Sequence, residues 1–378
     1  MNPFHRSLIV IAPVALLGLL ALGCTSISQP QGWAAPVVTD AGYLTSLHRG
    51  KLELVDKTTK AITWEFPPAS DNSLPLAYRQ TKLNGIYSTP AVAGGDTVVL
   101  GAYNGKVYAL KLADGTPIWK QPVDTGGAIV GNVAIDNGVA YVGNSEGDLL
   151  AIKVADGSLV WNKPFKAGDR IWSTPVVDNG VIYVTSMDRH VYALKEDSGT
   201  EIWKNSDSGG AITSTPSLDS GRLYFGAFDK HLYALDTQKN GAEVWKSSPS
   251  ADNWLWGHPL VQNGMVFTGS LAGTVYGVSA QDGTVQWQQK LGTSIRGRPT
   301  IAQGVLVVAD RNGRVDGYDP ASGAPKWSKP TELGSHSLGD LVAQSDGSVL
   351  VLTDGGTNGT RLVSIDPLTG TATDVAKP

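Results

Sequence analysis

A tryptophan recurs along the chain at a nearly constant interval, and this periodicity constrains the fold more than any other feature of the sequence. Four successive intervals are each 42 residues long, while the first and last are 55 and 40 residues. Intervals of this length indicate tandem copies of one supersecondary unit rather than unrelated domains. The recurring residues are Trp64, Trp119, Trp161, Trp203, Trp245, Trp287 and Trp327.

Each interval contains the same series of short apolar runs and tight turns. In the repeat that ends at Trp203, apolar and polar residues alternate with a period of two, which is typical of β-strands. Dipeptides that favour positive φ separate the runs, as Asn179-Gly180 does between the first and second strands. The pattern therefore predicts four short strands in every repeat.

The number of repeats sets the expected architecture. The first repeat begins at Ala34. A degenerate last repeat runs from Gly339 to Val375, where Asp374 replaces the tryptophan, so the total is eight. A repeat of about 42 residues with four strands and no helical stretch is typical of a propeller blade. We therefore predict an all-β fold, an eight-bladed β-propeller of four-stranded antiparallel blades.

The first 23 residues differ from the repeats in composition. A short, weakly positive start precedes an uncharged apolar run from Ser7 to Gly23, which is typical of a secretory signal peptide. The only cysteine, Cys24, follows directly, and this arrangement resembles a bacterial lipoprotein signal, in which cleavage leaves a lipidated cysteine at the N-terminus. A plain secretory signal and an uncleaved anchor are the alternatives. The expected organisation is a lipoprotein-type signal peptide (1–23), an N-terminal tether (24–33) and the propeller (34–378).

The turn between the third and fourth strands carries a more specific signature. The stretch from Tyr192 to Trp203, YALKEDSGTEIW, resembles the tryptophan-docking repeat of the pyrroloquinoline-quinone-type (PQQ-like) propellers, and the resemblance covers essentially the whole mature chain. A secreted lipoprotein of eight such repeats with no other domain also resembles the BamB-type family of outer-membrane assembly lipoproteins. This resemblance implies a non-catalytic scaffold, without a cofactor, that binds a protein partner through loops on one face.

The same resemblance implies a location and a partner. The protein would be secreted and held to a membrane by its N-terminal lipid, either on the outer membrane facing the periplasm or on the extracellular face of a single-membrane cell. In a cell with an outer membrane, the partner would be a β-barrel assembly insertase. A nucleic-acid partner is disfavoured, because 30 basic residues are balanced by 34 acidic ones and no segment concentrates positive charge.

A PQQ-dependent dehydrogenase and a sensor or small-ligand-binding propeller are the alternatives, because the same blade occurs in all of these proteins. The dehydrogenases often place a vicinal disulfide against the quinone, and the single Cys24 excludes one here. The stretch from Asp310 to Asp316 spaces oxygen atoms somewhat as a calcium loop does, but it aligns with an ordinary strand turn. His190 and His231 align with variable polar residues. We therefore expect no catalytic residue and no metal ligand.

The seven repeated tryptophans are expected to be structural docking residues, because an aromatic at the same place in consecutive blades fills the gap between neighbouring sheets. The long first interval departs from the repeat. Its excess lies between Glu65 and Leu83, a stretch rich in proline that also holds Phe66, Leu74, Leu76 and Tyr78. Such a loop suits either a protein contact or packing over the blade junction, and both interpretations stay open.

The links between blades supply the candidate binding residues. Each link crosses one face of a propeller, so the residues just before each inner strand gather at one mouth of the central channel. These residues are, in repeat order, Trp33, Tyr87, Val130, Trp172, Thr213, Trp256, Arg296 and Leu338. Two residues further on, on the same side of the strand, come Ala35, Thr89, Asn132, Thr174, Thr215, His258, Arg298 and Asp340.

Repeats six and seven bring aromatic and charged members of these two series together. Aromatic rings beside guanidinium groups suit a carboxylate, a peptide segment or an aromatic ligand. The alternative is that the side chains only cap the channel and solvate its rim. The candidate binding residues are Trp172, Trp256, His258, Arg296, Arg298 and Asp340.

Overall fold

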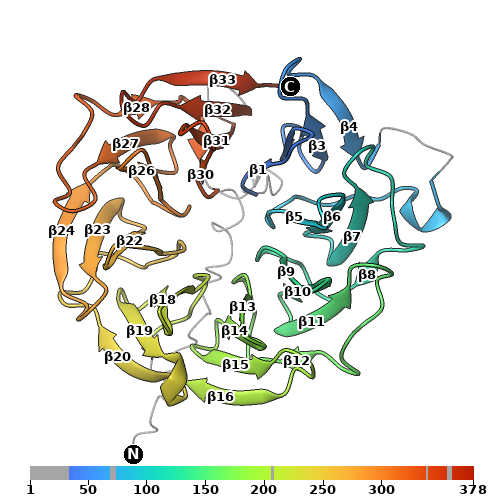
Figure 1. The fold of residues 1–378 in the computed structure, drawn as a ribbon, viewed down its shortest axis with the longest axis horizontal. Helices are drawn as coiled ribbons and strands as arrows, with labels where there is room; N and C mark the ends of the chain where they lie inside the picture. Colours follow the sequence, from blue (N-terminus) through green and yellow to red (C-terminus); the bar gives the residue numbers. More distant parts are fainter. Residues whose placement is uncertain (1–33, 69–73, 206–207, 338, 356–359) are drawn as a thin grey trace, which may run out of the picture. The chain divides into compact units, whose positions relative to one another are not determined.

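The computed structural model describes residues 34–68, 74–205, 208–337, 339–355 and 360–378. The predicted signal peptide, Cys24 and the tether lie outside these ranges. Within them the chain forms eight antiparallel sheets arranged as blades around a central axis (Figure 1), so the predicted all-β, eight-bladed propeller is confirmed. The described ranges contain two short 3-10 turns, η1 (Leu76–Tyr78) and η2 (Thr237–Lys239), and no helix long and apolar enough to cross a membrane.

In blades 1 to 7, four strands pair in sequence order from the channel outward. Blades 1 to 4 consist of β1 (Val37–Val38), β2 (Tyr43–Thr45), β3 (Leu52–Val55), β4 (Ile62–Phe66); β5 (Ala91–Ala93), β6 (Thr97–Gly101), β7 (Lys106–Lys111), β8 (Val123–Asp124); β9 (Ala134–Asp136), β10 (Val139–Gly143), β11 (Asp148–Lys153), β12 (Phe165–Lys166); and β13 (Val176–Asp178), β14 (Val181–Thr185), β15 (Val191–Lys195), β16 (Glu201–Asn205).

Blades 5 to 7 consist of β17 (Ser217–Asp219), β18 (Arg222–Gly226), β19 (Leu232–Asp236), β20 (Ala242–Lys246); β21 (Leu260–Gln262), β22 (Met265–Gly269), β23 (Thr274–Ser279), β24 (Val285–Lys290); and β25 (Thr300–Ala302), β26 (Val305–Ala309), β27 (Arg314–Tyr318), β28 (Thr331–Glu332). In blade 8 the inner position is divided between β29 (His336–Ser337) and β30 (Val342–Ala343), which both pair with β31 (Val349–Asp354), followed by β32 (Arg361–Ile365) and β33 (Ala372–Ala376).

The strands form where the sequence predicts them because each blade must bury both faces. The two middle strands of a blade, such as β14 and β15, are buried along almost their whole length, since a neighbouring sheet covers each face. The outer strand β16 is largely exposed, and Trp203 is its buried residue. Tight turns join the strands, as at Asn179 and Gly180, whose φ angles of 49° and 77° fit a type I′ turn.

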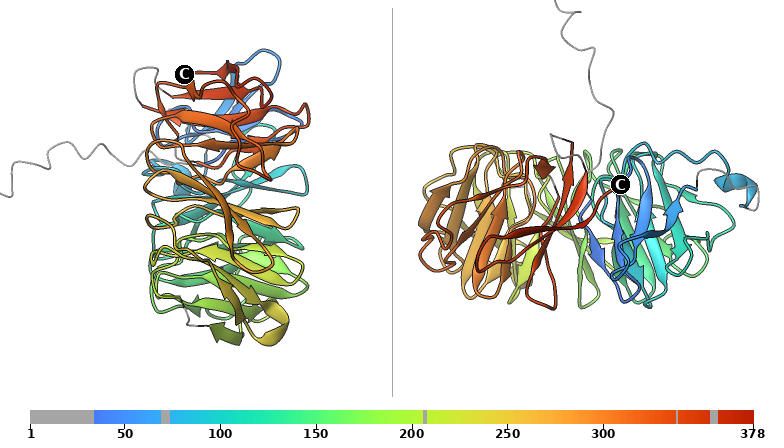
Figure 2. Two further views of the ribbon diagram at one scale, coloured as in Figure 1. Left: turned by 90° about the vertical axis from the view of Figure 1, so that its left-hand side faces the viewer. Right: turned by 90° about the horizontal axis from the view of Figure 1, so that it is seen from above.

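The alternating strand directions give the propeller two distinct faces, seen edge-on in Figure 2. The links between blades open on one face, together with the turns between second and third strands. We call this the link face. The turns between first and second strands and between third and fourth strands open on the opposite face.

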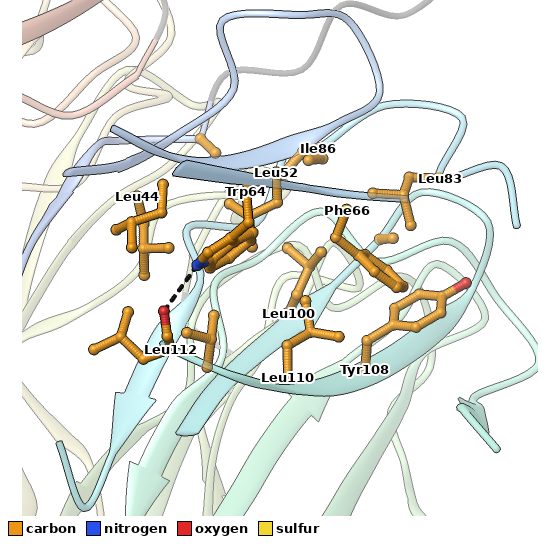
Figure 3. Packing of buried hydrophobic residues seen from close by; sticks show 14 of the residues in the cluster. Leu44, Leu52, Trp64, Phe66, Leu83, Ile86, Leu100, Tyr108, Leu110 and Leu112 are labelled. Atoms are coloured by element: carbon orange, nitrogen blue, oxygen red, sulfur yellow. Dashed lines mark hydrogen bonds between the residues drawn. The ribbon is translucent and has the colours of Figure 1, made fainter. Parts of the chain in front are cut away.

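The docking tryptophans lie between adjacent blades. Figure 3 shows Trp64 of blade 1 among the apolar side chains of blades 1 and 2, with its indole N–H donating to the Leu112 carbonyl at 2.8 Å. The ring lies against the backbone of Gly115 in the next blade, where an added Cβ would come within 2.6 Å of the indole. Gly115 has a φ of 70°, so glycine is required there for its conformation as well as for space.

The same contact recurs at the junctions that follow. All seven tryptophans lie against a positive-φ glycine of the next blade: Gly115, Gly157, Gly199, Gly241, Gly283, Gly323 and Gly370. Six of the seven also donate their indole N–H to a carbonyl of that blade, at 2.8 to 3.0 Å. Trp203 is the member for which the structure shows no such bond, and the turn it faces contains the extra η2 segment. The repeated tryptophan thus packs on a turn of the following blade rather than on the faces of the sheets alone.

The junction that closes the ring, from blade 8 to blade 1, is built differently. Asp374 occupies the tryptophan position, and its carboxylate accepts a hydrogen bond from Arg361 at 2.6 Å. The corresponding position in blade 1 is Lys60, with a φ of 61°, where the other turns have glycine. Among the described residues, an apolar cluster fills this junction: Tyr43, Leu47, Val55, Leu350, Leu362 and Ala376.

The described parts of the stretch from Glu65 to Leu83 are residues 65–68 and 74–83, and η1 lies at the outer edge of the propeller, at the right of Figure 1. Most of its described apolar side chains pack inward, because Phe66, Tyr78 and Leu83 are buried. Tyr78 also donates its hydroxyl to the Trp119 carbonyl at 3.1 Å. Leu76 points outward and is 80% exposed. The described part of the loop is therefore tied to the blade junction mainly by packing.

Candidate binding site at the channel mouth

The residues that precede the inner strands surround one cavity at the link-face mouth of the channel. This cavity is open to solvent, and the space between its lining atoms is about 500 Å³ when the part open to solvent is included. Residues from blades 2 to 8 line it: Tyr87, Thr89, Val130, Gly131, Asn132, Trp172, Thr213, Trp256, His258, Arg296, Gly339 and Asp340. Five of the six candidate residues thus share one cavity; Arg298 is outside its lining and is exposed. Trp33 and Leu338 lie outside the described residues.

The second series of predicted residues forms a ladder of hydrogen bonds from blade to blade. In each step, a backbone N–H donates to the side-chain oxygen of the equivalent residue in the next blade. The bonds run from Ala35 to Thr89 (2.9 Å), from Thr89 to Asn132 (2.7 Å), from Asn132 to Thr174 (3.1 Å), from Thr174 to Thr215 (2.8 Å) and from Arg298 to Asp340 (2.7 Å). These side chains satisfy backbone donors of the neighbouring blade, so their primary role is structural.

An ion pair interrupts the regular ladder on the side of blades 6 to 8. His258 Nδ1 lies 3.1 Å from Asp340 Oδ2, and each side chain is 23% exposed. Desolvation acts to raise the pKa of Asp340. The charge and hydrogen bond of His258 act in the opposite direction, as do the backbone N–H and the charge of Arg298. Together these interactions outweigh desolvation and lower the pKa of Asp340 to about 2. Asp340 is therefore a fixed negative charge whose two oxygens already have partners.

Arg296 has no comparable partner among the described residues. Its guanidinium lies over the ring of Trp256, 5.3 Å from the ring centre, and its Nε is buried without a hydrogen-bond acceptor. Burial lowers the pKa of Arg296 below its usual value, and the positive charge of Arg311 lowers it further. The Arg296 side chain is only partly buried and lines the open cavity, so its guanidinium retains the capacity to bind an oxyanion from a ligand.

A row of aromatic rings extends from the cavity across the link face. Trp172 and Trp256 lie 6.1 Å apart, and Trp256 stacks on Phe228 at 5.5 Å. Phe228 in turn stacks on Trp254 at 4.6 Å, with the two rings nearly parallel. Trp254 is 44% exposed, which is unusual for a large aromatic side chain. The row thus extends from rings that line the cavity, Trp172 and Trp256, to the solvent-exposed ring of Trp254.

Sequence reasoning missed Phe228 and Trp254. Phe228 lies in the turn between β18 and β19, and Trp254 lies in the link that precedes β21, four residues before His258. The strand directions place such turns and the links on the same face. An aromatic residue in a turn and another in the adjacent link could therefore have been used to predict their contact. The hydrogen bond from Leu271 N to Trp254 O (2.9 Å) fixes the link against blade 6.

The other residues considered as ligands have structural partners. Asp310 Oδ1 accepts the N–H groups of Asn312 and Arg314 at 2.9 and 3.0 Å, and its Oδ2 accepts the N–H of Thr293 at 2.7 Å. In blade 4, His190 Nδ1 lies 3.2 Å from Asp188 Oδ1. In blade 5, His231 Nδ1 lies 3.0 Å from the Ser247 carbonyl oxygen. Within the described ranges, no three His, Cys, Asp or Glu side chains are grouped to hold a metal ion.

The fold and the mouth define a class of protein, an eight-bladed propeller of PQQ-like repeats whose links surround an aromatic and cationic mouth. A family model described as "Outer membrane protein assembly factor BamB" matches residues 48–170, 166–239 and 229–377. These matches cover most of the chain, which therefore belongs to this family.

Individual relatives are more distant. The chain is 28% identical to the outer membrane protein assembly factor BamB of Yersinia pestis over 107 residues, and 28% identical to that of Shewanella oneidensis over 98 residues. These alignments cover 26% and 23% of this chain, and 27% and 25% of the relatives. The chain thus spans about a quarter of the length of the curated relatives it matches.

Solved structures support the fold. BamB from Moraxella catarrhalis superposes with a TM-score of 0.67 at 17% identity, covering 85% of this chain and 91% of the other. The computationally designed Ika8 protein superposes with a TM-score of 0.68 at 15% identity, covering 89% of this chain and 96% of the other. A designed protein shares the fold as closely as a natural one, so function must be argued from the site.

Proposed function

We propose that this protein is a non-catalytic scaffold of outer-membrane protein assembly, anchored by a lipid on Cys24, that binds a protein partner through the link face. The observation that carries the proposal is the aromatic row ending at the exposed Trp254, beside the unpaired Arg296. Exposed aromatics and arginine are the residues that most often supply binding energy at protein interfaces. The family description and the names of the two relatives support the assembly role.

The proposed partner is the β-barrel assembly insertase of the same membrane. The full-length protein, purified from its native membranes, is expected to retain the insertase, identified by mass spectrometry. Trp254→Ala is expected to reduce this retention strongly, because it removes an exposed ring without opening a core cavity. Leu368→Ala is the matched control, since Leu368 is 55% exposed on the opposite face. Equal retention by the wild type and Trp254→Ala would contradict the proposed face.

The two cationic residues of the mouth give a second test. Replacing Arg296 and Arg298 together by alanine is expected to weaken partner binding while leaving the melting temperature nearly unchanged, because neither guanidinium has an ion-pair partner among the described residues. If the double variant binds as well as the wild type, the contact lies elsewhere, for example at the outward-facing Leu76.

The lipid anchor is tested separately. Cys24→Ser is expected to release the protein from membranes and to abolish labelling by a radioactive fatty acid. A single N-terminus carrying acyl chains suits a protein that works at a membrane surface. Labelling that persists in the variant would overturn the anchor while leaving the partner proposal intact.

The donor set of the mouth does not fit the calcium and quinone of a dehydrogenase. Asp340 is the cavity's carboxylate, and His258 and the Arg298 N–H already engage it. Calcium requires six to eight oxygen ligands, including carboxylates free to coordinate. We therefore derive no reaction step through a quinone. Reconstitution with PQQ and calcium is expected to give no dye reduction, whereas measurable reduction would favour the dehydrogenase alternative.

A further inference from the structure

We propose that the mouth site binds an extended peptide segment of the partner that carries a carboxylate side chain followed by apolar side chains at alternate positions. The carboxylate would contact Arg296, and the apolar side chains would lie along the row formed by Trp256, Phe228 and Trp254. This inference rests on the proposed function, because it specifies the chemistry of the partner at the same face.

The charge of the ligand follows from the surroundings of Arg296. Its Nε has no acceptor among the described residues, and its side chain lines the open cavity, so the guanidinium gains most from a planar oxyanion presented from the cavity side. Asp340 does not serve this purpose, because its oxygens are held by His258 and by the Arg298 N–H. Arg311 adds positive charge close to Arg296. A carboxylate is therefore favoured over a neutral or cationic group.

The apolar part of the ligand follows from the spacing of the rings. Trp256 and Phe228 are 5.5 Å apart, and Phe228 and Trp254 are 4.6 Å apart. In an extended chain, side chains on the same side are separated by roughly 6.6 Å, because each residue advances about 3.3 Å. Both ring spacings are shorter than this repeat, so two successive alternate side chains can contact the row, one toward Trp256 and one toward Trp254. Phe228 is partly exposed and Trp254 is 44% exposed, so this pair of stacked rings offers apolar contact to such a chain.

The arrangement also explains why a free small anion is a poorer match. Trp256 and Arg296 line the cavity, whereas Trp254 lies outside its lining, so a small anion bound at Arg296 would leave the exposed Trp254 in contact with water. A peptide covers both features at once and adds apolar contact to the charge pairing.

The test uses the full-length protein in detergent and a fluorescently labelled peptide, Asp-Ser-Phe-Ser-Leu-Ser, with acetylated and amidated ends. Two companion peptides replace Asp by Asn, or Phe and Leu by Ser. Fluorescence anisotropy is expected to show that each companion binds roughly tenfold more weakly than the parent, the size expected for losing one charge-assisted contact or two partly exposed apolar contacts. Arg296→Gln is expected to abolish the preference for the Asp peptide over the Asn peptide. Trp254→Ala is expected to abolish the preference for the peptide with Phe and Leu over the peptide with Ser in their place.

Lys111→Gln on the opposite face is the control and is expected to leave all three affinities unchanged. Equal binding of the Asp and Asn peptides, or unchanged discrimination in Arg296→Gln, would overturn the inference. So would displacement of the peptide by acetate or benzoate at concentrations that match its own affinity. If the peptides fail to discriminate while Trp254→Ala still loses the insertase, this inference fails and the proposed function stands. Selective peptide binding without insertase retention supports this inference and overturns the proposed partner.

Discussion

Seven junctions of the ring are closed by a tryptophan on a glycine, and the eighth is closed without either residue. At the seven regular junctions the indole ring lies against a positive-φ glycine of the next blade. At the closing junction, Asp374 stands for the tryptophan and Lys60 for the glycine. The two members of the contact are therefore kept or lost together. The comparison shows that the repeat is defined by a contact between blades and not by either residue alone.

The physical reason is complementary shape. A large flat ring can approach the backbone of the next blade only where no Cβ stands in the way, and the turn there has a φ that favours glycine. Where the tryptophan ring is missing, glycine in the facing turn gives no packing advantage, and a lysine such as Lys60 is tolerated there. The closing junction instead uses the apolar cluster around Tyr43, Leu350 and Leu362, with the Arg361 to Asp374 pair at its edge.

The largest expected effect is the loss of a docking ring. Trp119 is the most buried of the seven, and its indole N–H donates to the Val154 carbonyl at 2.8 Å. Trp119→Ala is expected to lower the free energy of unfolding by about 3–5 kcal/mol. Trp203→Ala is expected to cost about 1 kcal/mol less within that range, since no carbonyl of the next blade loses a donor. Urea unfolding measures both, and an unchanged midpoint in either variant would contradict the docking role.

Filling the glycine side of the same contact is expected to have the next largest effect. A Cβ at Gly157 would lie 2.9 Å from the Trp119 ring, at a φ of 77°. Gly180 has the same φ but nothing within 4 Å of the added Cβ, so it is a matched control. In both alanine variants the strained backbone is expected to lower the free energy of unfolding by about 1–2 kcal/mol. In Gly157→Ala, overpacking against the ring is expected to lower it by about 1–3 kcal/mol more. Equal thermal unfolding of the two would show that the ring does not depend on close approach.

Asp340, in blade 8, allows a test of how much a polar contact contributes to stability near the junction that closes the ring. Its pKa of about 2 lies below the ordinary 3.8, so folding favours the charged form. The resulting stabilisation, about 2 kcal/mol, is complete above about pH 4 and is lost as the pH falls toward 2. Asp340→Asn is expected to lose this amount at pH 5 and to show a flatter stability profile below pH 4. Asp40→Asn, at an exposed aspartate, is the control, and identical profiles would argue against the ion pair.

The smallest expected effect is a gain from installing the missing contact. Lys60→Gly combined with Asp374→Trp is expected to stabilise the closing junction beyond the sum of the two single changes, with a coupling of about 1 kcal/mol. Asp374→Trp alone is expected to bring no benefit, because Lys60 carries a Cβ at the position where the regular contact has glycine. Additive single and double effects in a double-mutant cycle would show that the junction does not accept the regular contact.

The sequence predicted most of the fold because each local signal repeats. A turn such as Asn179-Gly180 would be weak evidence alone, but the same spacing in successive repeats leaves few alternatives to a propeller. The mouth residues were also accessible to prediction, because the strand period and the link positions place Trp172, Trp256 and Arg296 on one rim. Their binding role stays a prediction. Phe228 and Trp254 were missed, because their contact depends on how two separate loops fold over blades 5 and 6.

The sequence by itself determined the class of fold, the number of blades and the residues that meet at the channel mouth, since these follow from periodicity and chain direction. Only the tertiary structure decided which of those residues are used up by the protein's own contacts. Thr89, Asn132 and Asp340 satisfy backbone donors of neighbouring blades, whereas the Nε of Arg296 has no acceptor in the part of the chain that the structure describes. Hydrogen-bond partners are set by distances of a few tenths of an ångström between blades, and no sequence pattern specifies those distances.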